Sequence, residues 1–427
     1  MCAVALPGTI VAWMEPKTIA VLGTLDTKGV EHSFVAGQIR NRGYETLLID
    51  VGILEAAVAA DVTREQVAEA GRIDLAALIA AQDRGKAVAA MARAASVFVA
   101  NRVEEGRIHG IISLGGGGGT AIGTAAMRAL PLGFPKLMVS TLASGDVSDY
   151  VGTTDLVMMP SIVDVSGINR ISRVVLTRAA GAICGMVGAE PEPCSDDRPL
   201  IVASMFGNTT ACVEHAKGIL EEAGFEVLVF HSTGAGGRTM EALIESGSVA
   251  GVLDITTTEL ADELCGGVLS AGPDRLNATA RARVPAVVVP GCLDMVNFDA
   301  PDTVPQRYSG RTFYEHNPQV TLMRTGATEC AELGRMLGER VSAYSQHTRI
   351  MIPTKAISII SAEGQPFHDP EADEALFAAI REHCAEIQVV EEDVEINDPK
   401  FAEACAVALR TLILANRAIG SGEKQQR

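Results

Sequence analysis

Ile108-His-Gly-Ile-Ile-Ser-Leu-Gly-Gly-Gly-Gly-Gly-Thr120 carries the strongest structural signal in the chain, and a helical pattern follows it over Ala121–Leu130. The apolar run up to Leu114 has the length of a buried strand. Glycines without Cβ atoms bring backbone N–H groups close to an anion, and the start of a helix adds its positive dipole end. We therefore predict a phosphate site, with a flexible turn without ligand as the alternative. The residues assigned to it are Gly115, Gly116, Gly117, Gly118, Gly119 and Thr120.

The same order of strand, loop and helix recurs on both sides of this stretch. In the first half, strands are expected at Thr18–Leu22, Thr46–Asp50 and Lys136–Ser140, and a long helix at about Gly167–Val187. In the second half, strands are expected at Leu200–Ser204, Glu226–Phe230, Gly251–Ile255, Ala286–Val289, Ala356–Ile360 and Ile387–Val390. Strands that alternate with helices favour parallel sheets. We predict an α/β fold with two Rossmann-like subdomains and mainly parallel, doubly wound sheets.

The boundary between the subdomains is expected at Glu190–Pro199, a polar segment with three prolines. The predicted domains are residues 1–192 and 198–427. Val30-Glu-His32 in the first recurs as Val213-Glu-His215 in the second, which favours a duplicated βαβ unit. In doubly wound sheets, ligands bind at the carboxyl ends of the strands.

A second polar loop, Gly23-Thr-Leu-Asp-Thr-Lys-Gly29, follows the first strand. Thr24 suits a phosphate or a ribose, and Lys28 suits the charge of a phosphate. Asp26 suits Mg²⁺ or a ribose hydroxyl. The alternative is an ordinary helix cap without a ligand.

Charged side chains gather after the strands of the second half. Histidines suit general acid and base work, and arginines suit carboxylates or phosphates. The alternatives are structural histidines and surface ion pairs. We predict catalytic roles for His231, Asp254, Glu259, Arg275, Asp294, His316 and Arg324. No metal ligands are assigned.

The amino-acid composition limits the kinds of molecule that the protein is expected to bind. The 427 residues include 35 basic and 53 acidic ones, a net charge of −18. This argues against nucleic acids and anionic membranes as partners, because both require a basic surface. Nine cysteines without any C-x-x-C pattern fit reduced thiols. We expect a soluble, cytoplasmic protein.

Several strings together resemble one family. Thr24–Gly29, Gly115–Thr120, Asp254–Glu259, Ala271–Leu276 and His316–Thr325 occur in the order found in that family. It is the family of the N-terminal ATP-binding domain of the tomato mosaic virus resistance protein and its bacterial relatives. The resemblance covers about residues 17 to 410.

This resemblance implies two Rossmann-like subdomains, ATP binding by the first, and assembly as a dimer. We expect a homodimer or a higher homo-oligomer. The leading hypothesis is therefore an ATP-binding protein, with Mg²⁺ as a further candidate ligand. The alternative is an enzyme that acts on a small carboxylated or phosphorylated metabolite at the charged residues of the second half.

Overall fold

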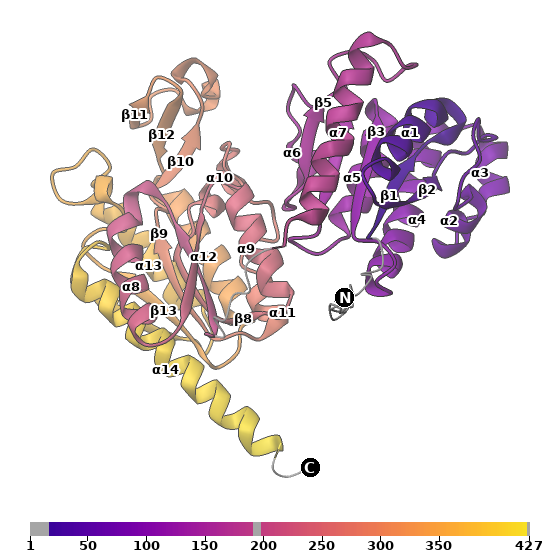
Figure 1. The fold of residues 1–427 in the computed structure, drawn as a ribbon. Coiled ribbons are helices and arrows are strands. Elements are labelled where there is room, and N and C mark those ends of the chain that lie inside the picture. Colours follow the sequence, from indigo (N-terminus) through magenta and orange to yellow (C-terminus); the bar gives the residue numbers. More distant parts are fainter. Residues whose placement is uncertain (1–16, 191–197, 425–427) are drawn as a thin grey trace, which may run out of the picture. The chain divides into compact units, whose positions relative to one another are not determined.

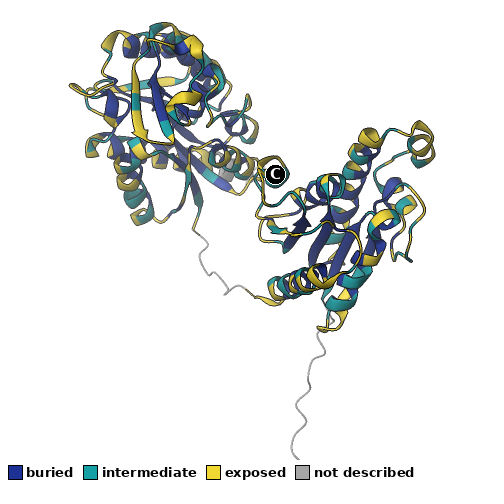
Figure 2. Cartoon of the chain, turned by 90° about the horizontal axis from the view of Figure 1, so that it is seen from above, coloured by how far each residue is buried: buried dark blue, intermediate teal, exposed yellow. Residues whose placement is uncertain are grey.

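The computed structural model describes residues 17–190 and 198–424, and the chain divides into two compact units at residues 194 and 195 (Figure 1). Most of the segment expected as a linker, 190–199, lies outside the described residues. Each unit has a parallel sheet whose strands are buried between helices, while the outer faces of the helices are exposed (Figure 2). The predicted α/β class with mainly parallel, doubly wound sheets is confirmed.

The first unit has a five-stranded sheet in the order β2-β1-β3-β4-β5, and its neighbouring strands are all parallel. Its strands are β1 (Thr18–Gly23), β2 (Glu45–Asp50), β3 (Gly110–Gly115), β4 (Lys136–Ser140) and β5 (Val157–Pro160). The order reverses between β1 and β3. In open α/β sheets the crevice at such a reversal is where ligands bind.

Seven helices accompany this sheet within residues 17–190: α1 (Leu25–Arg40), α2 (Arg64–Ala70), α3 (Leu75–Ala81), α4 (Arg84–Glu104), α5 (Gly117–Arg128), α6 (Ser148–Val151) and α7 (Arg170–Gly188). Side chains of α1 and α7 bury one face of the sheet, and side chains of α2, α4 and α5 bury the other. Among the described helices, α7 alone has the length and apolar composition of a membrane span. Its buried face packs into the core beside α1.

The sequence predicts one loop for the glycine run, but in the structure the run is divided between a strand and a helix. Gly115 ends β3, Gly116 is the residue before α5, and the helix begins at Gly117 rather than at Ala121. The chain thus passes from strand to helix within a single residue. This short connection is possible because Gly115 and Gly119 pack backbone against backbone, where a Cβ on Gly115 would lie 2.8 Å from the Cα of Gly119.

The second unit has a six-stranded parallel sheet in the order β14-β13-β9-β8-β6-β7. Its strands are β6 (Leu200–Met205), β7 (Glu226–His231), β8 (Val249–Thr256), β9 (Ala286–Gly291), β13 (Thr348–Pro353) and β14 (Gln388–Glu392). A separate antiparallel sheet has the order β10-β12-β11 and consists of β10 (Met295–Phe298), β11 (Phe313–Asn317) and β12 (Val320–Arg324). The helices are α8 (Thr210–Glu222), α9 (Ala235–Glu245), α10 (Glu259–Cys265), α11 (Ala278–Ala282), α12 (Ala327–Ser342), α13 (Pro370–His383) and α14 (Pro399–Lys424).

The prediction of a strand at Ala356–Ile360 is wrong. The fifth strand along the chain in this parallel sheet is β13, which ends at Pro353, and Ala356 makes only an isolated bridge to Glu395. Ser358 turns the chain here, because its hydroxyl accepts a hydrogen bond from the backbone N–H of Ser361 at 3.1 Å. The apolar side chains of Ile357 and Ile360 are buried from this turn rather than from a strand.

Candidate functional site

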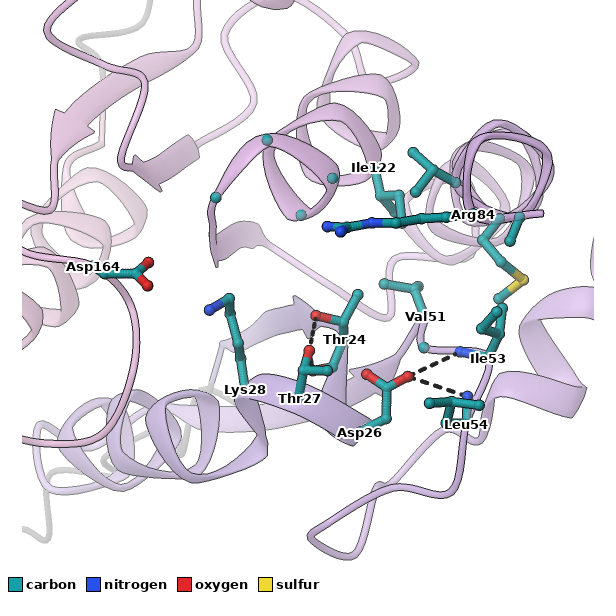
Figure 3. A pocket seen from close by; sticks show the side chains of 18 residues that line it. Thr24, Asp26, Thr27, Lys28, Val51, Ile53, Leu54, Arg84, Ile122 and Asp164 are labelled. Atoms are coloured by element: carbon teal, nitrogen blue, oxygen red, sulfur yellow. Dashed lines mark hydrogen bonds between the residues drawn. The ribbon is translucent and has the colours of Figure 1, made fainter. Parts of the chain in front are cut away.

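A cavity of about 530 Å³ lies in the first unit where the order of its strands reverses (Figure 3). We call it the nucleotide cavity, after the ligand that the sequence analysis expects there. Of the residues predicted as a phosphate site, Thr24, Asp26, Lys28 and Gly116–Gly119 line it. Gly115 and Thr120 do not line it. The Thr120 hydroxyl is buried and lies 2.7 Å from the Ser140 hydroxyl, so this predicted ligand contact is a contact between two elements of the fold.

Three of the glycines have no packing reason to be glycine. A Cβ on Gly117 would meet no atom within 4 Å, one on Gly116 would lie 3.7 Å from Thr141 Oγ1, and one on Gly118 would lie 3.5 Å from Val88. Glycine in a helix is less favourable than alanine by about 1 kcal/mol. No side chain caps α5. The first N–H groups of a helix have no partner within it, so this uncapped glycine turn presents free donors to the cavity.

The loop after β1 is held by its own contacts. Asp26 Oδ2 accepts hydrogen bonds from the N–H groups of Ile53, at 3.3 Å, and Leu54, at 3.1 Å, while Asp26 Oδ1 is buried without a partner (Figure 3). A Cβ on Gly52 would lie 2.7 Å from Asp26 Cγ, so glycine there admits the carboxylate. Asp26 therefore fixes the segment after β2 and retains one free acceptor.

Lys28 is tied to a more distant loop. Its ammonium group donates to the carbonyl oxygen of Val165, and α1 departs from helical geometry at Lys28, with φ −130° and ψ 26°. The neighbouring Thr24 and Thr27 hydroxyls lie 3.1 Å apart. The lysine therefore lines the cavity while it anchors the segment between β5 and α7.

Arg84, which the sequence analysis did not select, is the main cation of this cavity besides Lys28. Its guanidinium points into the cavity (Figure 3), and one of its nitrogens lies 3.7 Å from the position of a Cβ on Gly118. Within the described residues it forms no hydrogen bond or ion pair. Arg84 is exposed, so water solvates its charge, and the guanidinium is free to pair with an anion at the N-terminus of α5.

Arg84 was missed because the alanine-rich composition of Arg64–Val103 does not show where its helices begin. The structure has three helices there, and α4 begins at Arg84 because the Asp83 side chain accepts from the N–H of Lys86.

Asp50 was missed as well. It accepts from the N–H groups of Leu25, at 3.0 Å, and Gly52, at 2.9 Å, and burial raises its pKa.

In the second unit, three of the predicted catalytic residues form one closed cluster. Arg275 is 1% exposed, and its Nε donates to Glu259 at 2.6 Å. Its two terminal nitrogens donate to Asp254 at 2.7 Å each, and also to Glu241 at 3.2 Å and to the carbonyl oxygen of Thr256 at 3.3 Å. A guanidinium has five N–H donors, and all five are used. Arg275 has no donor left for a substrate in this geometry.

Arg324 and Asp294 are buried in the same way. Arg324 pairs with Asp373 at 2.6 Å and donates to the carbonyl oxygen of Phe367 at 2.8 Å. Asp294 Oδ2 accepts from the Ser358 hydroxyl at 2.7 Å, and Oδ1 is buried without a partner. Burial raises the pKa of Asp294 to about 6, and the nearby Arg324 only partly opposes this.

The two predicted histidines lie apart from these clusters. His231 is exposed at the end of β7, with its ring 5.4 Å from that of Phe206. His316 is exposed on β11, in the antiparallel sheet. The structure thus places the predicted catalytic residues in two buried ion clusters and at two exposed positions. Within the described residues, no group of three or more His, Cys, Asp or Glu is arranged to hold a metal.

Similar proteins were found in bacteria and in a plant. A protein of Clostridium tetani is 48% identical over 396 residues, covering 92% of this chain and 98% of its own. A protein of Mesorhizobium japonicum is also 48% identical, with the same coverage. The ToMV resistance protein Tm-1 of Solanum lycopersicum is 41% identical over 75% of this chain, which spans 44% of the tomato protein.

Among solved structures, a putative UDP-N-acetylglucosamine 2-epimerase from Listeria monocytogenes matches 64% of this chain and 79% of its own, with 10% identity and a TM-score of 0.22. A likeness this weak bears on neither activity nor ligand. The model of the UPF0261 N-terminal domain matches residues 17–192, and that of the UPF0261 C-terminal domain matches residues 198–413. Both are described as an uncharacterised protein family. The predicted kinship with the tomato resistance protein and its bacterial relatives is confirmed, and the chain belongs to the UPF0261 family.

Proposed function

We propose that the first unit binds a nucleotide, ATP, in the nucleotide cavity. The observation that carries this proposal is the uncapped glycine turn of α5, which opens into the cavity next to the unpaired guanidinium of Arg84. Backbone donors, a helix dipole and a cation together favour a group with several negative charges. A volume of about 530 Å³ suits a ligand of this size.

The lining of the cavity supports one orientation of the nucleotide. The phosphates lie against Gly116–Gly118, Arg84 and Lys28. Apolar side chains of the lining suit the base: Val51, Ile53, Leu54, Ala87, Val88, Met91 and Ile122. Mg²⁺ enters with the phosphates, which together with water supply most of its ligands.

The test uses a glycine with room for a side chain. A Cβ on Gly117 would meet nothing within 4 Å, so Gly117→Val adds bulk at the lining of the cavity without a clash at Cβ. Isothermal titration calorimetry of the full chain with ATP and Mg²⁺ should show binding, and Gly117→Val should abolish it. Gly185→Val is the matched control, because Gly185 lies in α7 with equally open surroundings. Absence of ATP and ADP binding at millimolar concentration, or unchanged binding by Gly117→Val, would overturn the proposal.

The alternative is an enzyme that acts on a small carboxylated or phosphorylated metabolite in the second unit. Its support is weaker, because the donors of Arg275 are already used by protein acceptors. The exposed His231 and His316 are the members of that set with room for a ligand.

Compartment and assembly complete the proposal. The seven described cysteines are free and buried thiols, which supports a reducing compartment such as the cytoplasm. Self-association as a homodimer has some support from the exposed Val407 and Leu414 on α14. Sedimentation equilibrium of the wild type and of Leu414→Glu tests it, because a charge on a buried interface shifts the equilibrium to monomer.

A further inference from the structure

A second cavity, of about 600 Å³, lies beside the nucleotide cavity in the first unit. We call it the acceptor cavity. Its polar lining comes from the last residue of β4 and from the segments after β4 and β5: Ser140, Thr141, Ser144, Ser161 and Asp164. Asp164 lines both cavities, and Thr141 Oγ1 lies 3.7 Å from the position of a Cβ on Gly116. The two cavities therefore meet next to the expected phosphate position.

Some of these polar groups are already used by the fold, and others are free. The Ser140 hydroxyl contacts Thr120, and the Ser161 hydroxyl donates to the carbonyl oxygen of Val163 at 2.7 Å. Within the described residues, the side chains of Thr141, Ser144 and Asp164 form no hydrogen bond or ion pair. Two hydroxyls and one carboxylate are therefore available to a ligand that carries hydroxyl groups of its own.

The backbone around Asp164 is strained and held from both sides. Ile162 has φ +67°, which is rare for a β-branched residue, and it is 74% exposed, so burial of its side chain does not offset the strain. The N–H of Val163 donates to the carbonyl oxygen of Ser161 at 2.8 Å and closes a tight three-residue turn. Backbone strain of this kind gathers at functional sites.

Two residues of α1 fix the other side of this segment. Lys28 donates to the carbonyl oxygen of Val165, and the Glu31 carboxylate accepts from the N–H of Gly167. The segment is thus anchored to the helix that begins at the nucleotide cavity. The anchors set the position of the Asp164 backbone and leave its carboxylate free between the two cavities.

We propose that the first unit is a phosphotransferase whose acceptor is a small hydroxyl-bearing molecule bound in the acceptor cavity. This rests on the proposed binding of ATP. The acceptor oxygen attacks the terminal phosphorus of ATP, a P–O bond to the acceptor forms, and the bond to the bridging oxygen of ADP breaks. Asp164 takes the proton of the acceptor hydroxyl, and the products are a phosphate ester and ADP. Such transfers depend mainly on positioning and on charge stabilisation, which Arg84 and the glycine turn supply.

The experiment follows the label from ATP. The full-length protein is incubated with Mg²⁺ and ATP labelled at the terminal phosphorus, together with sugars, polyols and hydroxy acids and with a deproteinised small-molecule extract of bacterial cells. Chromatography then separates labelled phosphate esters from inorganic phosphate. Asp164→Asn should lower ester formation by about 10²- to 10⁴-fold, the usual contribution of a general base, and leave the Kd for ATP within about twofold. Asp149→Asn, an exposed carboxylate that lines neither cavity, is the control.

The possible outcomes distinguish failure of the phosphotransferase proposal from failure of the proposed ATP binding. Absence of ATP binding by calorimetry overturns both. Binding of ATP without any labelled ester, or ester formation by Asp164→Asn at the wild-type rate, overturns the phosphotransferase alone. Thr141→Val provides a second variant, which should raise the KM for the acceptor more than that for ATP.

Discussion

The imidazole ring of His32 lies directly against the backbone of Gly23, so that a Cβ on Gly23 would lie 1.9 Å from Nε2. The position of the ring is fixed, because it is fully buried and its Nδ1 lies within hydrogen-bond distance, 2.7 Å, of the carbonyl oxygen of Lys28. Burial also lowers the pKa of His32, so the ring is neutral at pH 7. This contact fixes the end of β1 against α1, directly beneath the loop that lines the nucleotide cavity.

Gly23→Ala should therefore destabilise the first unit by about 3 kcal/mol, the upper end of what overpacking of a core costs, because the added Cβ would lie so close to the ring. Urea denaturation followed by circular dichroism measures the change. His32→Ala in the same chain removes the clash and should restore part of the loss. Gly37→Ala is the control, since its Cβ meets nothing within 4 Å and alanine favours the helix. A Gly23→Ala protein as stable as the wild type would contradict this packing.

Arg84→Gln should weaken ATP binding by about 10- to 100-fold, which corresponds to the loss of one charge-assisted hydrogen bond. The fold should be unaffected, because the guanidinium has no partner to lose. Calorimetry at two salt concentrations measures the affinity and its dependence on charge. Arg93→Gln removes an exposed charge from the same helix and should leave binding intact. Equal affinities of the two variants would exclude a phosphate contact by Arg84.

Arg275→Lys should destabilise the second unit by about 3 kcal/mol or more, because an ammonium group cannot supply the donors that the buried Asp254 and Glu259 and the half-buried Glu241 require. The free energy of unfolding of this unit is the quantity to measure. ATP binding by the first unit should persist in the variant, since the two units have separate cores. A stable Arg275→Lys protein with a lost enzymatic activity would instead support a substrate-binding role for the arginine.

Asp294→Asn should change how stability depends on pH. The carboxyl of an unfolded chain has a pKa of about 3.9, whereas burial raises the pKa of Asp294 to about 6. As pH rises, the unfolded state releases this proton first, so the free energy of unfolding falls between about pH 4 and pH 6 and then levels off. Relative to Asp294→Asn, the wild type should lose about 2 to 3 kcal/mol between pH 4 and pH 7.

Urea midpoints of both proteins at pH 4.5, 5.5, 6.5 and 7.5 test this prediction. The other titrating groups are common to both proteins and cancel in the difference. The Ser358 hydroxyl still finds an acceptor oxygen in the variant, so any constant offset between the curves reflects the amide nitrogen alone. A difference that does not vary with pH would contradict the raised pKa.

The sequence predicted the strands that are buried on both faces, because these are continuous apolar runs. Lys136–Ser140 agrees with β4 residue for residue. The short edge strand β5 was missed, since its four residues are only partly covered. The antiparallel sheet was missed because His316 and Arg324, on β11 and β12, were interpreted as catalytic residues rather than as parts of strands.

For the candidate site, the sequence could locate the loops, but it could not show whether a charged side chain is free or already paired within the protein. Gly116–Gly119 and Thr24–Lys28 were found because carboxyl ends of parallel strands meet at one edge. Spacing alone does not reveal whether an arginine is open to a ligand or already enclosed. All the N–H donors of Arg275 are used by protein acceptors, whereas Arg84 uses none of its donors in this way. The sequence does not distinguish these two arginines.

The enclosed guanidinium of Arg275 has a consequence for how this family can diverge. Its carboxylates come from α9, β8 and α10, and loss of the arginine would leave the buried Asp254 and Glu259 without their ion-pair partner. A single substitution at any of the four positions therefore carries a penalty that only further changes in the same cluster can remove. We therefore expect Glu241, Asp254, Glu259 and Arg275 to be retained or replaced together in related proteins.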